Sequence, residues 1–213
     1  MRQLPLDLSA RPDAKFGNFL AGGNAEALQA VRSLAAGTLA EAVVYLWGGR
    51  GSGRTHLLLA AARENPALTV ADDVETLDPD AQQVLFVAIN EAREGRAAVL
   101  AAGNAPPAQL RLRDDLRTRL AWGLVYQLQP LTDAEKKAHL QAAARERGLV
   151  LADEVATYLL SRLPRDLASL QDMLDRLDRV SLAKQRPLTV PLVREALADP
   201  ASGELVPRQR GGG

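Results

Sequence analysis

Residues 47–55, which read Trp-Gly-Gly-Arg-Gly-Ser-Gly-Arg-Thr, constrain the possible folds more than any other stretch of the chain. An apolar run at residues 42–46 precedes them, and a helix-forming run at residues 57–62 follows them. A strand, a glycine-rich loop and a helix in this order form the setting that a phosphate-binding loop needs. Glycines let backbone N–H groups close around phosphate oxygens, and the helix contributes the positive end of its dipole. Nucleotide binding is therefore the favoured interpretation, and a glycine-rich turn without a ligand is the alternative.

The residues of this loop follow the Walker A spacing with one departure. Arg54 occupies the position where lysine is usual, and Thr55 follows it. Thr55 is expected to place its hydroxyl group on Mg²⁺. Arginine is planar, forked and bulkier than lysine, so the departure affects hydrolysis more than it affects binding. The expected nucleotide contacts in the loop itself are Gly48, Gly51, Ser52, Gly53, Arg54 and Thr55.

The composition limits which ligands the chain can take. Among its 213 residues, 26 are Lys or Arg and 26 are Asp or Glu, so the formal net charge is zero. A protein that binds duplex DNA on its own usually carries an excess of positive charge, and this chain has none. The composition therefore favours a nucleotide and protein partners as ligands. The absence of Cys suits a reducing cytoplasm. With no apolar run of transmembrane length and no signal peptide, we expect a cytoplasmic protein without a membrane partner, and a homo-oligomer is compatible with this composition.

Polar side chains follow the second and third predicted strands, at residues 68–71 and 97–102. In phosphate-loop proteins, acids at the carboxyl end of such a strand hold Mg²⁺ and orient water. Asp72 is therefore the candidate for the metal and Asp73 the candidate for the water. Asn104 is placed to hold the attacking water or a phosphate oxygen. A solvated strand end is the alternative for the acids, and an ordinary turn is the alternative for Asn104.

Helices are predicted between the strands. One covers residues 25–36, one begins at the Asp-Pro pair of residues 78 and 79, and a short one at residues 115–121 carries Arg117 and Arg119. A fourth strand is predicted at residues 124–128. Helices between successive short apolar strands predict an α/β fold with a short parallel sheet.

Pro130 marks a boundary beyond which no strand is predicted. A capping box at residues 132–135 opens the first of several amphipathic helices, which together predict a small helical bundle. We therefore expect four segments, namely an extended tail at residues 1–14, a nucleotide-binding αβ domain at residues 15–130, an all-α domain at residues 131–199 and a disordered tail at residues 200–213.

The amino-terminal tail alternates apolar and polar residues at positions 3–8, Gln-Leu-Pro-Leu-Asp-Leu. An extended peptide with apolar side chains at alternate positions can dock in a groove of a partner. A frayed terminus is the alternative interpretation. The residues expected to dock are Gln3, Leu4, Leu6 and Leu8.

Several of these stretches together resemble the DnaA/Hda family of AAA+ proteins. Residues 3–8 are similar to the sliding-clamp-binding peptide of the Hda branch, and residues 16–24 are similar to the adenine-side segment of the family. Residues 51–57 resemble the Hda phosphate loop, in which arginine also replaces lysine, and residues 115–123 resemble the segment that carries the arginine finger. The resemblance covers about residues 3–198 and does not include the DNA-binding domain of the initiator.

The resemblance implies roles for individual residues. Asp72 would be the Walker B metal acid with Asp73 as its neighbour, and Asn104 would be the sensor on the third strand. Arg119 would be the finger offered to the nucleotide of a neighbouring molecule, and Arg165 would be the sensor arginine of the helical lid. A solvated helix face is the alternative for both arginines. The same resemblance adds two residues to the nucleotide site, Phe16 and His56.

The function implied by the resemblance is the regulatory inactivation of the DnaA initiator, which prevents re-initiation. Such a protein holds ADP, or ATP, with Mg²⁺, binds the DNA-loaded sliding clamp, and stimulates hydrolysis of DnaA-bound ATP rather than its own. The alternatives are a free-standing ATPase of the helicase-loader type and a non-catalytic adaptor on the clamp. One departure concerns the sheet: the strand and helix that the family inserts before Asp72 are absent, which leaves about four strands.

Overall fold

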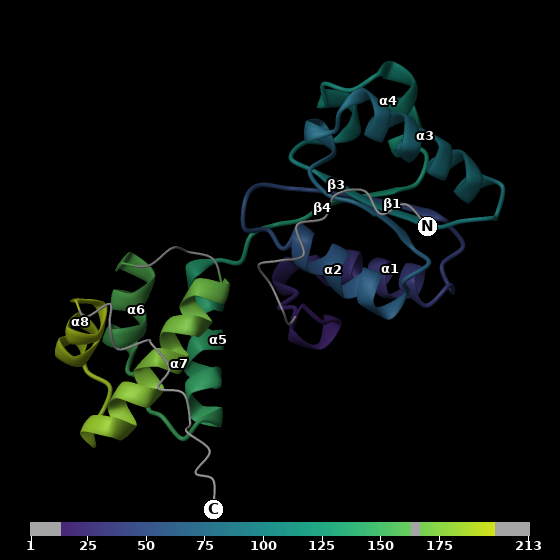
Figure 1. Cartoon of the computed structure of the whole chain (residues 1–213). Coiled ribbons are helices and arrows are strands. Elements are labelled where there is room, and N and C mark those ends of the chain that lie inside the picture. Colours follow the sequence, from purple (N-terminus) through teal and green to yellow (C-terminus); the bar gives the residue numbers. More distant parts are fainter. Residues whose placement is uncertain (1–13, 163–166, 199–213) are drawn as a thin grey trace, which may run out of the picture. The chain divides into compact units, whose positions relative to one another are not determined.

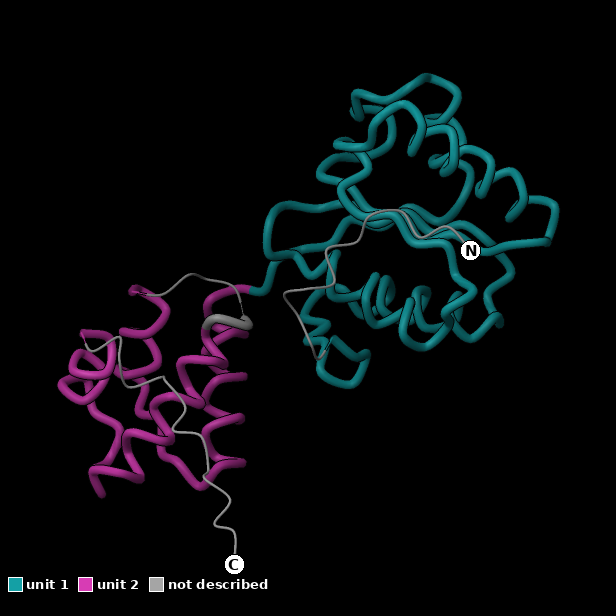
Figure 2. The backbone as a smooth tube through the Cα atoms, viewed as in Figure 1, with its two compact units in different colours: residues 1–131 teal, residues 132–213 magenta. Residues whose placement is uncertain are grey.

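The computed structural model describes residues 14–162 and 167–198, which form two compact units. The first unit spans residues 1–131 and the second spans residues 132–213 (Figure 2). Arg165 and the tail residues Gln3, Leu4, Leu6 and Leu8 lie outside the described residues, as does the segment at residues 199–213. Each unit is described by itself below.

A four-stranded parallel sheet organises the first unit, as the sequence predicted. Its strand order is β2-β3-β1-β4. In the register of the sheet, Trp47 lies opposite Gly103 on one neighbour and opposite Gln127 on the other. The carboxyl ends of three strands therefore meet at one edge of the sheet. The strands are β1 (Val43–Trp47), β2 (Thr69–Ala71), β3 (Val99–Gly103) and β4 (Leu124–Gln127).

Two pairs of helices cover the two faces of this sheet (Figure 1). The helices α1 (Ala25–Ala35) and α2 (Arg54–Glu64) cover one face. The helices α3 (Pro79–Arg93) and α4 (Asp114–Leu120) cover the other. Both faces are buried, and successive residues of a strand point to opposite faces, so β1 is apolar throughout.

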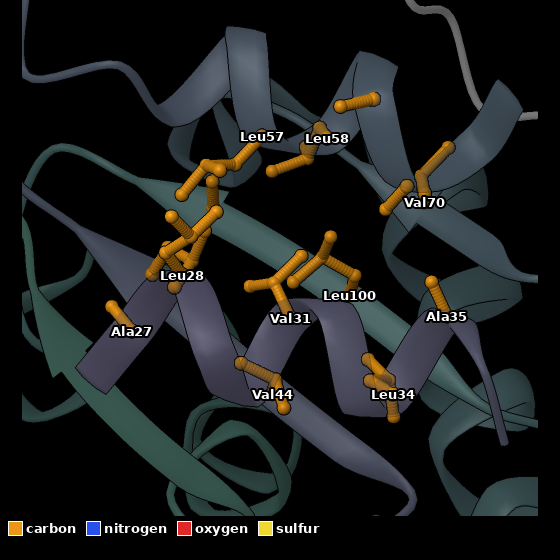
Figure 3. Packing of buried hydrophobic residues seen from close by; sticks show 14 of the residues in the cluster. Ala27, Leu28, Val31, Leu34, Ala35, Val44, Leu57, Leu58, Val70 and Leu100 are labelled. Carbon is orange, nitrogen blue, oxygen red and sulfur yellow. The ribbon is translucent and has the colours of Figure 1, made fainter. Parts of the chain in front are cut away.

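The core beneath α1 and α2 is aliphatic. Val44 of β1 and Leu100 of β3 are fully buried there, and Val31 of α1 and Leu57 of α2 pack into the same cluster (Figure 3). Burial of one such side chain stabilises the fold by about 1.5–3 kcal/mol. The phosphate loop leads directly into α2, so this packing also holds the loop in place.

Short 3₁₀ turns occur in segments that the sequence analysis treated as loops. Before α1 they are η2 (Phe16–Asn18) and η3 (Gly22–Asn24), after β2 there is η4 (Val74–Thr76), and after β3 there is η5 (Pro107–Gln109). The side chain of Asn24, at the end of η3, forms two hydrogen bonds with the backbone of Gln129. Its amide donates to the Gln129 carbonyl at 2.8 Å, and its oxygen accepts from the Gln129 N–H at 2.7 Å.

The second unit is entirely helical in its described part. Its first helix begins at the predicted capping box, because the Thr132 hydroxyl accepts from the Glu135 N–H and the Glu135 carboxylate accepts from the Thr132 N–H. The Thr132 N–H and the Thr132 hydroxyl both donate to the Glu135 carboxylate, and these two hydrogen bonds lower the pKa of Glu135. No helix within the described ranges combines the length and apolarity needed to cross a membrane. The helices are α5 (Asp133–Glu146), α6 (Asp153–Arg162), α7 (Leu167–Lys184) and α8 (Val190–Ala198).

Gly123 lies where α4 turns into β4, and the chain there is too close to β1 for a side chain. A Cβ atom on Gly123 would stand 2.1 Å from the carbonyl oxygen of Val43. We expect Gly123→Ala to lower the free energy of unfolding by about 1–3 kcal/mol, because backbone must move to admit the methyl group. Urea unfolding measures this loss. Gly17→Ala is the control, because no atom lies within 4 Å of the Cβ position there. Equal stability of the two variants would show that position 123 does not require glycine.

Candidate nucleotide-binding site

The glycines of the phosphate loop are required by its geometry. Gly51 and Gly53 have φ angles of +79° and +97°, a region that other residues rarely adopt. A Cβ atom on Gly53 would also lie 2.6 Å from the ring of Phe19. A Cβ atom on Gly48 would lie 2.5 Å from the carbonyl oxygen of Leu128. The loop is therefore held tightly between the segment before α1 and the end of β4.

The side chains of Thr55 and Asp72, the two candidates for holding a metal, meet at the start of α2. The Thr55 hydroxyl donates a hydrogen bond of 2.6 Å to a carboxylate oxygen of Asp72. The described residues contain no cluster of three or more His, Cys, Asp or Glu that could hold a metal by itself. Two oxygen donors suit Mg²⁺, which usually keeps several waters and binds one or two protein groups together with phosphate oxygens. Thr55 and Asp72 would hold the ion, and the ion would neutralise phosphate charge.

Arg54 pairs with the second acid of the site. Its Nη2 atom lies 3.1 Å from a carboxylate oxygen of Asp73, and its side chain is 14% exposed. Its Nη1 atom and the Ser52 hydroxyl are buried and have no hydrogen-bond partner among the described residues. Buried donors without partners are costly, and phosphate oxygens would satisfy both. The donor set of the loop therefore fits a nucleotide.

Glu75 belongs to this site, although the sequence analysis did not select it. The turn η4 carries its carboxylate back to the end of β3, where it accepts from the backbone N–H of Asn104 at 3.3 Å. The pKa of Tyr45 is raised mainly because its hydroxyl group is buried, and the negative charge of Glu75 raises it further. The Tyr45 hydroxyl donates to the Ala105 carbonyl at 2.8 Å. Asn104 itself is exposed at the end of β3. The sequence signal for Glu75 was its position three residues after Asp72, but using it required the 3₁₀ turn.

The two aromatic residues of the segment before α1 lie in different places. Phe16 is 7% exposed and packs in the core, with the guanidinium group of Arg32 5.6 Å from its ring centroid. Phe19 lies against the phosphate loop at Gly53, and its ring centroid is 5.4 Å from that of His56. Phe19 is therefore the aromatic residue of this segment that borders the loop, and residue spacing alone did not distinguish it from Phe16.

Arg119 lies apart from the phosphate loop, on the surface formed by α3 and α4. Its Nε donates to the side-chain oxygen of Asn90 at 2.7 Å. Its guanidinium carbon lies 4.7 Å from the ring centroid of Phe86 and 4.2 Å from that of Trp122. Trp122 belongs to the finger segment recognised in the sequence. Asn90 and Phe86 were not expected there, because their contacts with Arg119 join positions about thirty residues apart.

The position of Trp122 shows which edge of the sheet Arg119 occupies. Trp122 lines a pocket with residues 41–43, at the amino end of β1. The phosphate loop follows the carboxyl end of β1, at Trp47. A strand rises about 3.3 Å per residue, so the length of β1 separates the two edges by roughly 13 Å. Arg119 and the phosphate loop therefore face opposite edges of the sheet.

Comparison with solved structures shows which known proteins share this fold. The chain is similar to domain III of the replication initiation protein DnaA from Thermotoga maritima, with a TM-score of 0.69 and 21% identity over 89% of this chain and 97% of that one. It is also similar to AMPPCP-bound DnaA from Aquifex aeolicus, with a TM-score of 0.66 and 21% identity over 80% and 66% of the two chains. A RuvB variant from Thermotoga maritima matches with a TM-score of 0.62 and 16% identity over 87% and 72%. The fold is that of an AAA+ protein.

The second unit matches a known family model. Residues 133–197 match the family model described as the lid domain of Hda. An AAA+ fold similar to DnaA is thus followed by a lid of the Hda type, and the resemblance to the DnaA/Hda group is confirmed.

Proposed function

We propose that this DnaA-related AAA+ protein acts as a negative regulator of replication initiation. In this proposal it binds ADP with Mg²⁺ at the phosphate loop and the DNA-loaded sliding clamp through residues 3–8. Arg119 then enters the nucleotide site of an ATP-bound DnaA initiator and stabilises the charge that develops on the γ-phosphate. Hydrolysis therefore takes place in the partner, and re-initiation is prevented.

The observation that carries the proposal is the location of Arg119. An arginine held by Asn90, Phe86 and Trp122 at the edge of the sheet opposite its own phosphate loop cannot act on its own nucleotide without leaving those contacts. It remains partly exposed and available to a neighbouring molecule. Preorganisation of this kind suits a charge that must be in place before the transition state forms.

The pairing of Arg54 with Asp73 supports a binding role for the protein's own site. Asp73 is the acid that was expected to orient water, and here a guanidinium group neutralises it from 3.1 Å. A carboxylate engaged in this way is a poor base for water activation. A site that holds nucleotide and hydrolyses it slowly is the expected result.

We therefore expect the purified protein to bind ADP and to turn over ATP well below about 1 s⁻¹, the lower range of typical enzymes. Steady-state phosphate release and an ADP titration measure the two properties. Thr55→Val is the matched control, since it removes the hydroxyl that contacts Asp72 and should weaken Mg²⁺-dependent binding. Turnover at or above the stated rate would instead favour the free-standing ATPase.

A non-catalytic clamp adaptor is the other alternative, and it does not need Arg119. A reconstituted reaction separates it from the proposed regulator. The reaction contains the sliding clamp on DNA, the ATP-bound initiator and this protein, and hydrolysis of the initiator's ATP is followed in a single turnover. Stimulation that depends on clamp and DNA supports the proposal, and clamp binding without stimulation supports the adaptor.

A further inference from the structure

A pocket lies beside Arg119, at the amino end of β1. The pocket, of about 310 Å³, is lined by residues 41–43, Ile89, Arg93 and Trp122, together with Gly123. The absence of a side chain on Gly123 brings β4 against Val43 at this place. Most of the lining is apolar, and Trp122 remains 44% exposed. We refer to these residues as the Trp122 pocket.

The charges around this pocket are unbalanced. The guanidinium carbon of Arg93 lies 4.3 Å from the Trp122 ring centroid, and that of Arg119 lies 4.2 Å from the same centroid. No described residue forms an ion pair with either of them. Arginines nearby are neutralised, with Arg96 paired to Glu94 and Arg117 paired to Asp114. Two cations that share one exposed indole therefore mark this surface as a site for an anionic group.

We infer that the Trp122 pocket and Arg93 form a docking site for a segment of the partner protein in which an apolar side chain stands next to a carboxylate. The apolar side chain would fill the pocket over Ala42 and Ile89, and the carboxylate would pair with Arg93. Glu41, the exposed carboxylate of the lining, favours an arrangement in which the partner's acid lies on the Arg93 side. The inference rests on the proposed function, because the partner is the ATP-bound initiator on which Arg119 acts.

The shared indole connects docking with catalysis. Contacts made at Arg93 fix the distance between the partner and Trp122, and Trp122 carries Arg119. Arg93 would therefore determine how tightly the partner binds, whereas Arg119 would determine how fast its nucleotide is hydrolysed. Binding and rate separate in this way when one group acts in the ground state and the other only in the transition state.

The test compares Arg93→Ala with Arg96→Ala, which removes the same charge from a neighbouring exposed site. We expect Arg93→Ala to raise the half-saturating concentration for the initiator by about tenfold, as for loss of a charge-assisted hydrogen bond, with the maximal rate unchanged. Arg96→Ala should change neither value. Ala42→Phe fills the pocket without removing charge and should also raise the half-saturating concentration, once thermal unfolding has shown that the variant is folded.

Direct binding of the initiator, measured by fluorescence anisotropy, makes the outcomes distinct. If the unaltered protein binds the initiator but does not stimulate hydrolysis, the proposed function is wrong, and the docking site is still judged from the binding of the variants. If Arg93→Ala binds like the parent, the docking site is wrong even where stimulation is intact. A lower maximal rate with unchanged half-saturation would also overturn it, because Arg93 would then act only through Arg119.

Discussion

Arg119→Ala is expected to reduce the stimulated hydrolysis of initiator-bound ATP by about 10³-fold or more, the usual contribution of an arginine finger. The side chain is expected to act only in the partner's transition state, so its removal should appear in the rate and not in assembly. Affinities for ADP and for the clamp should stay at their parent values. Single-turnover hydrolysis measures the rate, and separate titrations measure the two affinities.

Arg117→Ala is the matched control for this experiment. Arg117 lies two residues away on the same short helix, but it pairs with Asp114 at 2.8 Å instead of stacking on Trp122. Its loss should change the rate little. Arg165→Ala should differ from both, because Arg165 is expected to contact the protein's own nucleotide and its loss should weaken ADP binding. Normal stimulation by Arg119→Ala would show that the finger assignment is wrong and would favour the adaptor.

Deletion of residues 1–8 is expected to abolish clamp binding. Gln3 would donate and accept hydrogen bonds in a small pocket of the clamp, and Leu6 and Leu8 would fill an apolar one. Complete burial of each leucine contributes about 1.5–3 kcal/mol, so loss of both weakens binding by about 10²-fold or more. Surface plasmon resonance on immobilised clamp measures the loss.

Point variants show whether the deletion acts through these side chains. Replacing both Leu6 and Leu8 by alanine should reproduce most of the loss. Asp7→Ala should have little effect, because in a peptide bound in the extended form the side chain of Asp7 would point away from those of its two neighbours. ADP affinity should be the same in all of these proteins. Full clamp affinity after the deletion would place the anchor elsewhere in the chain.

The fold was predictable because its determinants are local. Apolar runs bounded by glycine and proline identify the strands, and the αβ alternation with a parallel sheet follows from them. The spacing around Thr55 also located the glycine-rich loop between β1 and α2, and the structure adds a hydrogen bond from Thr55 to Asp72. Strand boundaries shifted by one or two residues, since strand ends depend on pairing with neighbours rather than on composition.

The parts of the site that the sequence did not disclose depend on tertiary packing. Asp73, which pairs with Arg54, adopts a left-handed φ of 42°, and nothing in its sequence neighbours signals this conformation. Glu75 reaches the end of β3 only through an unpredicted 3₁₀ turn. In the sequence, Asn90 is one polar residue of an amphipathic helix, and only the packing of α4 against α3 shows that it contacts Arg119. Periodicity identifies which face of an element is apolar, but not which polar side chains meet.

The double hydrogen bond between Asn24 and Gln129 has a mechanical consequence. It holds both the N–H and the carbonyl of the residue that follows Leu128, so the chain leaves the sheet in a fixed direction. Pro130, the next residue, has a restricted φ of its own. The end of the first unit is therefore tied to the segment before α1, the same segment that borders the phosphate loop through Phe19.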